Sequence, residues 1–95
     1  MLNGQQKKYL RREAQNMKAI FQVGKDGVSE KQIQSILDAL KAKELVKVKL
    51  LQTCPMSVNE AAIEIAAGTK SEVVHIIGHT IIFYRKSDKV LYKLP

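Results

Sequence analysis

The sequence has few of the residues on which disulfide bonding, metal binding and catalysis depend. Cys54 is the only cysteine, so no internal disulfide can form, and a four-ligand zinc site would need both His75 and His79 together with a carboxylate. No nucleotide-binding loop of the G-x-x-x-x-G-K-S/T type and no H-E-x-x-H or G-x-S-x-G pattern is present. We therefore expect no catalytic activity, no metal site and no cofactor, and we interpret Cys54 as a loop or small core residue.

Long apolar runs are also missing. No segment approaches the roughly eighteen consecutive apolar residues of a membrane-spanning helix. Residues 1–6 lack the apolar run of a signal peptide, and the single cysteine fits a reducing, intracellular setting. The sequence therefore predicts a cytoplasmic protein without a membrane partner.

The chain has an excess of positive charge. Sixteen Lys and Arg against nine Asp and Glu give a formal charge of +7, with an isoelectric point near 9.7. Most of this excess lies in residues 1–50, which carry +6, whereas residues 51–95 carry +1. Such a balance favours polyanionic partners and places the contact surface mostly in the first half of the chain, although many small proteins are basic without binding anything.

A helix is predicted from residue 4 to about residue 17. Asn3 can cap its first turn, and Gln6, three residues later, can complete a capping box. At about 100° per residue, the apolar side chains gather on one side of this helix and the basic ones on the opposite side. The packing side holds Tyr9, Leu10, Ala14 and Met17, and the basic side holds Lys7, Lys8, Arg11 and Arg12.

Residues 19–43 predict a buried strand followed by a helix. The short apolar run at 19–23 ends at Gly24, which favours a strand within a sheet. Ser29 is placed to cap the next helix, with Gln32 as the partner of its capping box. The packing face of that helix recurs at helical spacing in Ile33, Ile36, Leu37 and Leu40.

A second strand is predicted at residues 44–51, where apolar and basic residues alternate. Because side chains of a strand point to opposite faces in turn, this strand buries Val46, Val48 and Leu50 and turns Lys47 and Lys49 outward. The alternative role for these two lysines is to keep an exposed sheet face soluble.

The remaining residues predict a short helix and a hairpin. Ser57 and Glu60 form a third capping box, and Gly68 closes the helix that follows. The β-rich runs at 73–77 and 80–85 are separated by Gly78-His79, a spacing that suits a tight antiparallel hairpin. Residues 90–94 are expected to form a short edge strand or a tail.

The order of elements is therefore α-β-α-β-α-β-β, which predicts an α/β fold of two layers with a mixed four-stranded sheet. The first two strands are joined through a helix and should run parallel by a right-handed crossover. Ninety-five residues suffice for one modest core, so we expect a single domain spanning residues 1–95 and take a monomer as the default.

The stretch Gly24-Lys25-Asp26-Gly27 is the strongest candidate for a phosphate contact. Two glycines leave the backbone uncovered, so its N–H groups can approach a phosphate, and the following helix adds its positive N-terminal end. Lys25 supplies a cation at the tip, whereas Asp26 lowers the local potential. The alternative is a tight turn with glycines at both ends for conformational reasons alone.

Several stretches resemble the CRM domain, the RNA-binding module of chloroplast splicing factors, whose stand-alone bacterial members are the YhbY-type proteins. They cover nearly the whole chain in the family's order: residues 5–11, 23–28, 44–49, and 77–80 through 84–85. The resemblance implies a fold similar to the C-terminal domain of bacterial translation initiation factor three. It also implies association with precursors of the large ribosomal subunit.

The resemblance further implies roles for individual residues. The family's Gly-Lys-x-Gly loop corresponds to residues 24–27, so its RNA-facing role carries onto Gly24, Lys25 and Gly27. The family's basic first helix carries onto the four cations of residues 7–12. Position 79, often Lys in the family, is His here, which puts a fixed positive charge in that hairpin in doubt.

Two classes of function follow from these patterns. The first is an RNA-binding ribosome assembly factor that binds the backbone of large-subunit precursor rRNA. In this interpretation the basic helix and the loop form one continuous electropositive surface. The surface is extended by Lys47 and Lys49 and, less strongly, by Arg85 and Lys86. The five aromatic residues do not form the stacking platform of an RRM, so we expect little base stacking. The second class is a basic protein-interaction module that docks on an acidic protein, with the first helix merely solvated.

Overall fold

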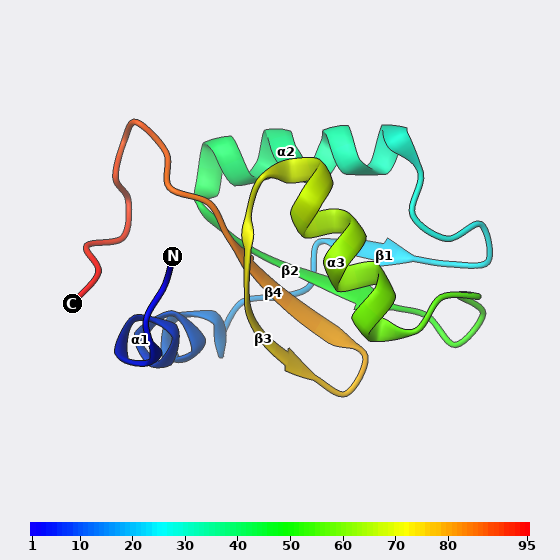
Figure 1. Cartoon of the computed structure of the whole chain (residues 1–95), viewed down its shortest axis with the longest axis horizontal. Coiled ribbons are helices and arrows are strands. Elements are labelled where there is room, and N and C mark those ends of the chain that lie inside the picture. Colours follow the sequence, from blue (N-terminus) through cyan, green and yellow to red (C-terminus); the bar gives the residue numbers. More distant parts are fainter.

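A computed structural model describes all residues from 1 to 95. It contains three helices and four strands in the predicted order (Figure 1). They are α1 (Gly4–Ala14), β1 (Phe21–Val23), α2 (Glu30–Lys43), β2 (Leu45–Leu50), α3 (Val58–Thr69), β3 (Glu72–Ile77) and β4 (Thr80–Tyr84). None of the helices is long and apolar enough to cross a membrane.

The strands form one mixed sheet in the order β1-β2-β4-β3. β1 runs parallel to β2, with Phe21 opposite Val48, and β4 is antiparallel to both β2 and β3. The two-residue turn between β3 and β4 places Gly78 at a φ of 58°, as a tight hairpin requires. The predicted α/β class with a mixed four-stranded sheet is therefore confirmed.

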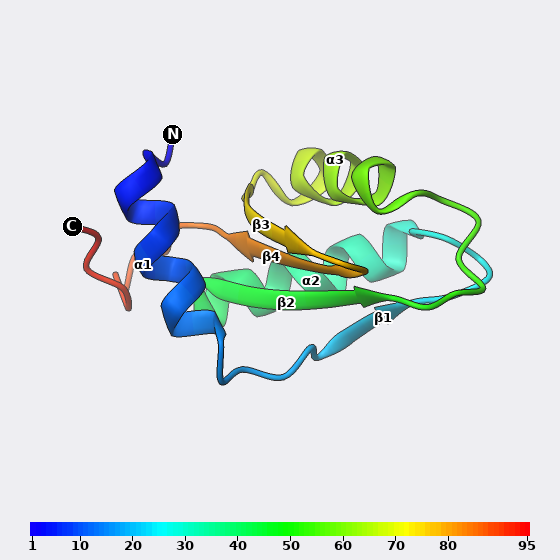
Figure 2. The same cartoon turned by 90° about the horizontal axis from the view of Figure 1, so that it is seen from below.

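The two faces of the sheet are covered differently. α2 and α3 pack on one face and enclose a cluster of eleven buried residues, in which Ile36 and Leu40 of α2 meet Val46, Val48 and Phe83. Leu37, which the spacing also placed on the packing face, is only half-buried. α1 lies against the other face at one end of the sheet (Figure 2), which adds cover there to the predicted two layers.

Two of the three predicted capping boxes form completely. Asn3 with Gln6 and Ser57 with Glu60 exchange both hydrogen bonds. At α2 the Ser29 hydroxyl accepts from the Gln32 N–H, but the Gln32 side-chain amide instead donates to the carbonyl of Gln22, at 2.7 Å. The reciprocal half of that box was wrongly predicted, because a carbonyl of the neighbouring strand competes for the same side chain.

Several element ends differ from those predicted. α1 ends at Ala14 and not near residue 17, and α3 continues through Gly68 to Thr69, with Lys70 in the left-handed conformation beyond it. A Cβ on Gly68 would lie 2.9 Å from the side chain of Ile33, so glycine here allows α2 and α3 to approach closely. β1 is limited to three residues.

The start of β2 also differs. Glu44 belongs not to the strand but to the end of α2, where it has a φ of 67° and is fully buried. Residues 90–94 form a tail and no strand, which was one of the two expected outcomes.

Candidate nucleic-acid interface

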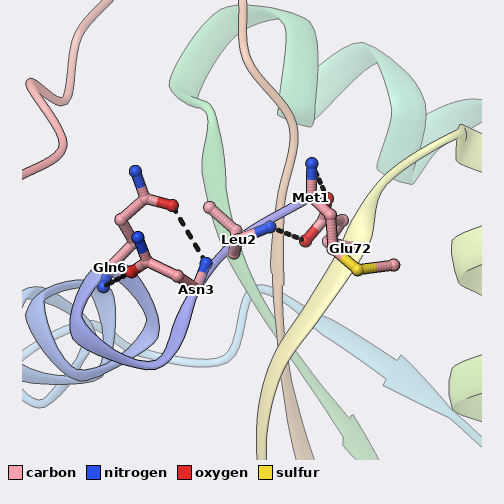
Figure 3. A network of polar contacts seen from close by, with 5 residues as sticks. All are labelled: Met1, Leu2, Asn3, Gln6 and Glu72. Atoms are coloured by element: carbon pink, nitrogen blue, oxygen red, sulfur yellow. Dashed lines mark hydrogen bonds and ion pairs between the residues drawn. The ribbon is translucent and has the colours of Figure 1, made fainter.

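α1 is fixed at its start to the edge of the sheet (Figure 3). The Leu2 N–H donates to Glu72 Oε2 at 2.8 Å, the Met1 amino group lies 3.4 Å from Glu72 Oε1, and Asn3 then caps the first turn. Leu10 and Ala14 are completely buried against the sheet. This packing fixes the rotation of the helix, so its basic side must face solvent.

The basic side of α1 lines an open depression of about 620 Å³, which we call the α1 hollow. Its lining residues are Gly4, Lys8, Arg11, Arg12 and Gln15. Lys7, predicted to belong to the same surface, is half-buried and does not line this depression. Three of the four predicted helix cations are therefore brought together.

Almost none of the positive charge is neutralised within the molecule. The only ion pair joins Met1 to Glu72, so no Lys or Arg side chain is directly paired with a carboxylate. Unpaired cations keep a positive potential at the surface, which attracts polyanions and raises their rate of encounter. If these cations were paired with carboxylates of the protein, little positive charge would remain to attract a polyanion.

His75 of β3 lies next to this basic surface. Burial lowers the pKa of His75 below its ordinary value, and the positive charge of Arg11 lowers it further. The imidazole is therefore neutral near pH 7 and adds no charge to the surface around α1.

The sheet face beyond α1 carries Lys47 and Lys49. No helix covers the part of this face towards the ends of β1 and β2 (Figure 2). There Lys49 is exposed and stands between Gln22 of β1 and Thr80 of β4. Lys47 is half-buried, and its ammonium group donates to the Met17 carbonyl at 3.0 Å, so it holds the segment after α1 against the sheet.

The Gly24–Gly27 loop leads from β1 into α2, as predicted. The Gly27 N–H donates to the Gly24 carbonyl at 3.0 Å, and Gly27 has a φ of 68°, whereas Gly24 does not need the left-handed region. Only one of the two glycines is thus required for conformation. Lys25 and Asp26 are exposed at the tip.

Beside this loop is a second open depression, of about 590 Å³, which we call the loop hollow. Lys25 lines it together with Lys31, which stands in the first turn of α2 and was not predicted to contribute. Lys31 follows the Ser29 cap by two residues. The start of this helix was already a candidate for phosphate binding, so a lysine so close to it could have been predicted to contribute. Phe21 is the only hydrophobic residue among the ten that line the depression, and Lys25 and Lys31 are its two cations.

The prediction of one continuous electropositive surface is wrong. α1 and the Gly24–Gly27 loop lie at opposite ends of a molecule 37 Å long, in both views (Figures 1 and 2). The cause is that the segment after α1 and then β1 carry the chain along the long axis before the loop begins. Lys49 lies on the sheet between the two ends, so the structure has two basic ends and not one compact patch.

Arg85 and Lys86, which were expected to extend the same surface, line neither the α1 hollow nor the loop hollow, but they border a depression with Gln6 at the start of α1. They line a third depression beyond the end of β4, together with Lys41 of α2. No three His, Cys, Asp or Glu side chains gather in a way that could hold a metal ion. Cys54 is half-buried and packs at the margin of the α2 and α3 core.

Comparison with known proteins gives a consistent result. The family model described as the CRS1 / YhbY (CRM) domain matches residues 2–85. The chain is 45% identical over 89 residues to a Bacillus subtilis protein named "Probable RNA-binding protein YqeI", covering 94% of this chain and 93% of that protein. It is 31% identical over 98 residues to a Haemophilus influenzae protein named "RNA-binding protein", covering 99% and 95% respectively.

A solved structure has the same fold. The solution structure of a hypothetical protein from Staphylococcus aureus superposes with a TM-score of 0.84, at 43% sequence identity and over the full length of both chains. The arrangement of three helices around a mixed sheet is therefore shared with that protein.

Proposed function

Because this chain belongs to the CRS1 / YhbY (CRM) domain family, we propose that it binds RNA, and that it acts as a monomeric cytoplasmic assembly factor on large-subunit precursor rRNA. The observation that carries the proposal is that no Lys or Arg side chain forms an internal ion pair, so the cations of the α1 hollow, Lys49 and the loop hollow all remain available to an external polyanion. Two relatives are named as RNA-binding proteins, one of them as probable, which supports RNA as that polyanion.

The RNA is held through its phosphates and its shape. Arg11 and Arg12 supply planar groups with several donors each, which suit phosphate oxygens, and Lys25 and Lys31 supply mobile point charges at the other end. At the start of α2, the free backbone N–H groups add partial positive charge. A ligand that touches both ends must extend along most of the 37 Å axis, which suits structured RNA.

We propose no catalytic activity. The depressions are lined by cations and neutral polar groups, with Asp26 the only carboxylate in the first two, and neither holds a nucleophile beside a base. Binding through phosphates needs neither.

Sedimentation of cell extracts, with and without ribonuclease, tests the proposal. The protein should sediment with large-subunit precursors, and ribonuclease should release it. The Lys8→Gln/Arg12→Gln variant should lose sedimentation, whereas Lys43→Gln/Lys70→Gln, which removes two exposed lysines outside the α1 and loop hollows, should keep it. Crosslinking in cells followed by sequencing should recover one region of large-subunit rRNA.

Survival of the association after ribonuclease would reject RNA as the partner. It would favour the alternative, a module that docks on an acidic protein. Crosslinks spread evenly over all cellular RNA would reject the assembly role and leave general RNA binding.

A further inference from the structure

A third basic depression lies where α2 ends and the chain leaves β4. It has a volume of about 480 Å³, and we call it the C-terminal hollow. Its lining residues are Lys41, Arg85, Lys86, Ser87, Asp88 and Lys89, with no apolar side chain among them. Four cations therefore face one carboxylate, and none of the four is in an ion pair.

Buried hydrogen bonds hold this segment in place. The Glu44 carboxylate accepts from the Ser87 hydroxyl and from the backbone N–H groups of Ser87, Leu91 and Tyr92, the last three at 3.3, 2.8 and 3.3 Å. The Arg85 N–H donates to the Glu44 carbonyl at 2.9 Å. We call this set of contacts the Glu44 network, and it orders residues 85–92 before any ligand arrives.

The Glu44 network also determines the charge state of the carboxylate that holds this segment. Burial alone would raise the pKa of Glu44, but the hydrogen bonds from Ser87, Leu91 and Tyr92 outweigh it and lower the pKa below its ordinary value. Glu44 is therefore ionised near pH 7, and together with Asp88 it leaves the four cations of the hollow with a net charge of +2. The cations of the hollow line an open depression, where a phosphate can reach them. Arg85 can bind such a phosphate through several N–H groups.

The position of the hollow separates it from the other basic surfaces. In Figure 1 the segment after β4 first rises beside the end of α2, on the side of the sheet away from α1, and then returns towards α1 at the C-terminus. Lys49 shares the sheet face with α1. Lys41 of α2 therefore lies on the opposite side of the sheet from Lys49. Arg85 and Lys86 lie nearer the edge of the sheet, where they also line a depression with Lys70 and with Gln6 of α1.

We infer that the C-terminal hollow binds backbone phosphates of a second RNA segment, so that one copy of the protein holds two segments together. This inference rests on the RNA binding proposed above and adds the second site to it. Two segments of a folding RNA can be held together by two separate basic surfaces, because each neutralises the phosphates of its own segment.

Native mass spectrometry with a short RNA hairpin tests the inference. The wild-type protein should form complexes of one protein with one and with two hairpins. In the Lys41→Gln/Lys86→Gln variant, affinity for the first hairpin should change by less than about twofold. Affinity for the second should fall about tenfold or more, because two charged hydrogen bonds are lost. Lys43→Gln/Lys93→Gln removes the same charge at two exposed positions that line neither the hollow nor the depression beside it, and this variant should keep both complexes.

Each of the other outcomes would contradict either the second site or the proposed function. A wild-type protein that never exceeds one hairpin overturns the second site, and so does a Lys41→Gln/Lys86→Gln variant whose first affinity falls as far as its second. Equal loss of the second hairpin in both variants would mean that net charge alone attracts it. A wild-type protein that binds no hairpin at all rejects the proposed function itself, which is a distinguishable result.

Discussion

The two faces of the sheet differ in how many residues they bury. On one face α2 and α3 enclose eleven buried residues, and on the other α1 encloses only six, at one end. Because burial of apolar surface is the main source of folding free energy, the first face contributes most of the stability. The second face can therefore leave much of its surface to charged and polar side chains, including Lys49 and Gln22.

The side chains of β2 alternate between these two faces. Along β2 the residues Val46, Val48 and Leu50 point into the larger cluster, whereas Lys47 and Lys49 point to the other face. A shift of one residue in register would bury the lysines and expose the valines. The same alternation thus specifies both the core and one of the candidate contacts.

The largest expected effect comes from removing bulk on the stable face. Ile36 is fully buried between α2 and the sheet, and Ile36→Ala should lower the free energy of unfolding by about 2–5 kcal/mol, because it removes apolar contacts and leaves a cavity. Lys49→Ala, on the open face, should change it by less than about 0.5 kcal/mol. Urea unfolding of both variants measures the difference, and equal effects would contradict the division between the faces.

The second-largest effect on the free energy of unfolding is expected from the Glu44 network. This network joins the end of α2 to the C-terminal tail, in which Tyr92 and Leu94 pack beside α1. Glu44→Gln should lower the free energy of unfolding at pH 7 by about 1.5–3 kcal/mol, the range for hydrogen bonds to a charged group. Because the folded-state pKa lies below the ordinary value of 4.5, the stabilisation is present above that value and is lost as the pH falls through the folded-state pKa.

Unfolding midpoints measured at pH 7 and near pH 3.5 check this sign. The wild-type protein should lose more stability between the two than Glu44→Gln does, since the variant has no carboxylate to protonate there. Glu64→Gln, at an exposed position of α3, is the control and should keep the wild-type pH dependence. Identical pH profiles for wild type and Glu44→Gln would remove the network as a source of stability.

The two glycines of the Gly24–Gly27 loop provide a matched pair. Gly27→Ala should cost about 1–2 kcal/mol, because an alanine at a φ of 68° is strained. Gly24→Ala should cost less than about 0.5 kcal/mol, since its Cβ would meet Leu51 and Thr53 at 3.7 and 3.9 Å, ordinary contact distances. If Gly24 gives a phosphate access to the backbone, Gly24→Ala should weaken RNA binding without changing the melting temperature. Unchanged affinity would limit the loop to the role of a turn.

The sequence predicted best what depends on near neighbours. The caps at Asn3 and Ser57, the apolar spacing of α2 and the Gly78-His79 hairpin all arise within a few residues, and the structure confirms them. The diversion of Gln32 to a carbonyl ten residues away was not predictable in the same way. Local patterns cannot show which distant group competes for a side chain.

The site was harder to predict because its parts meet only through the fold. Nothing local indicates that Lys41 lies beside Arg85, or that Glu44 accepts hydrogen bonds from residues more than forty positions later. Nor does spacing along the chain reveal that α1 and the Gly24–Gly27 loop stand at opposite ends. The cations themselves were identifiable from charge, but their grouping required the positions of the strands.

Lys25 gives the most direct test of the loop hollow, with an effect on stability as small as that expected for Lys49→Ala. It is exposed at the tip of its loop, so Lys25→Ala should change the free energy of unfolding by less than about 0.5 kcal/mol. If it contacts one phosphate, the variant should bind all RNA sequences more weakly by a similar factor. The slope of log affinity against log salt should fall in magnitude by roughly 0.7–0.9, the contribution of one released counterion.

Two controls separate a phosphate contact from general charge. Lys43→Ala removes one exposed positive charge from the opposite end of α2 and should leave the slope unchanged, whereas Asp26→Asn, in the same loop, should strengthen binding because the carboxylate repels phosphate. Salt titrations of the three variants provide the comparison. If Lys25→Ala keeps the wild-type affinity and slope while RNA still binds, the contact belongs to α1 and Lys49, and the loop only turns the chain into α2.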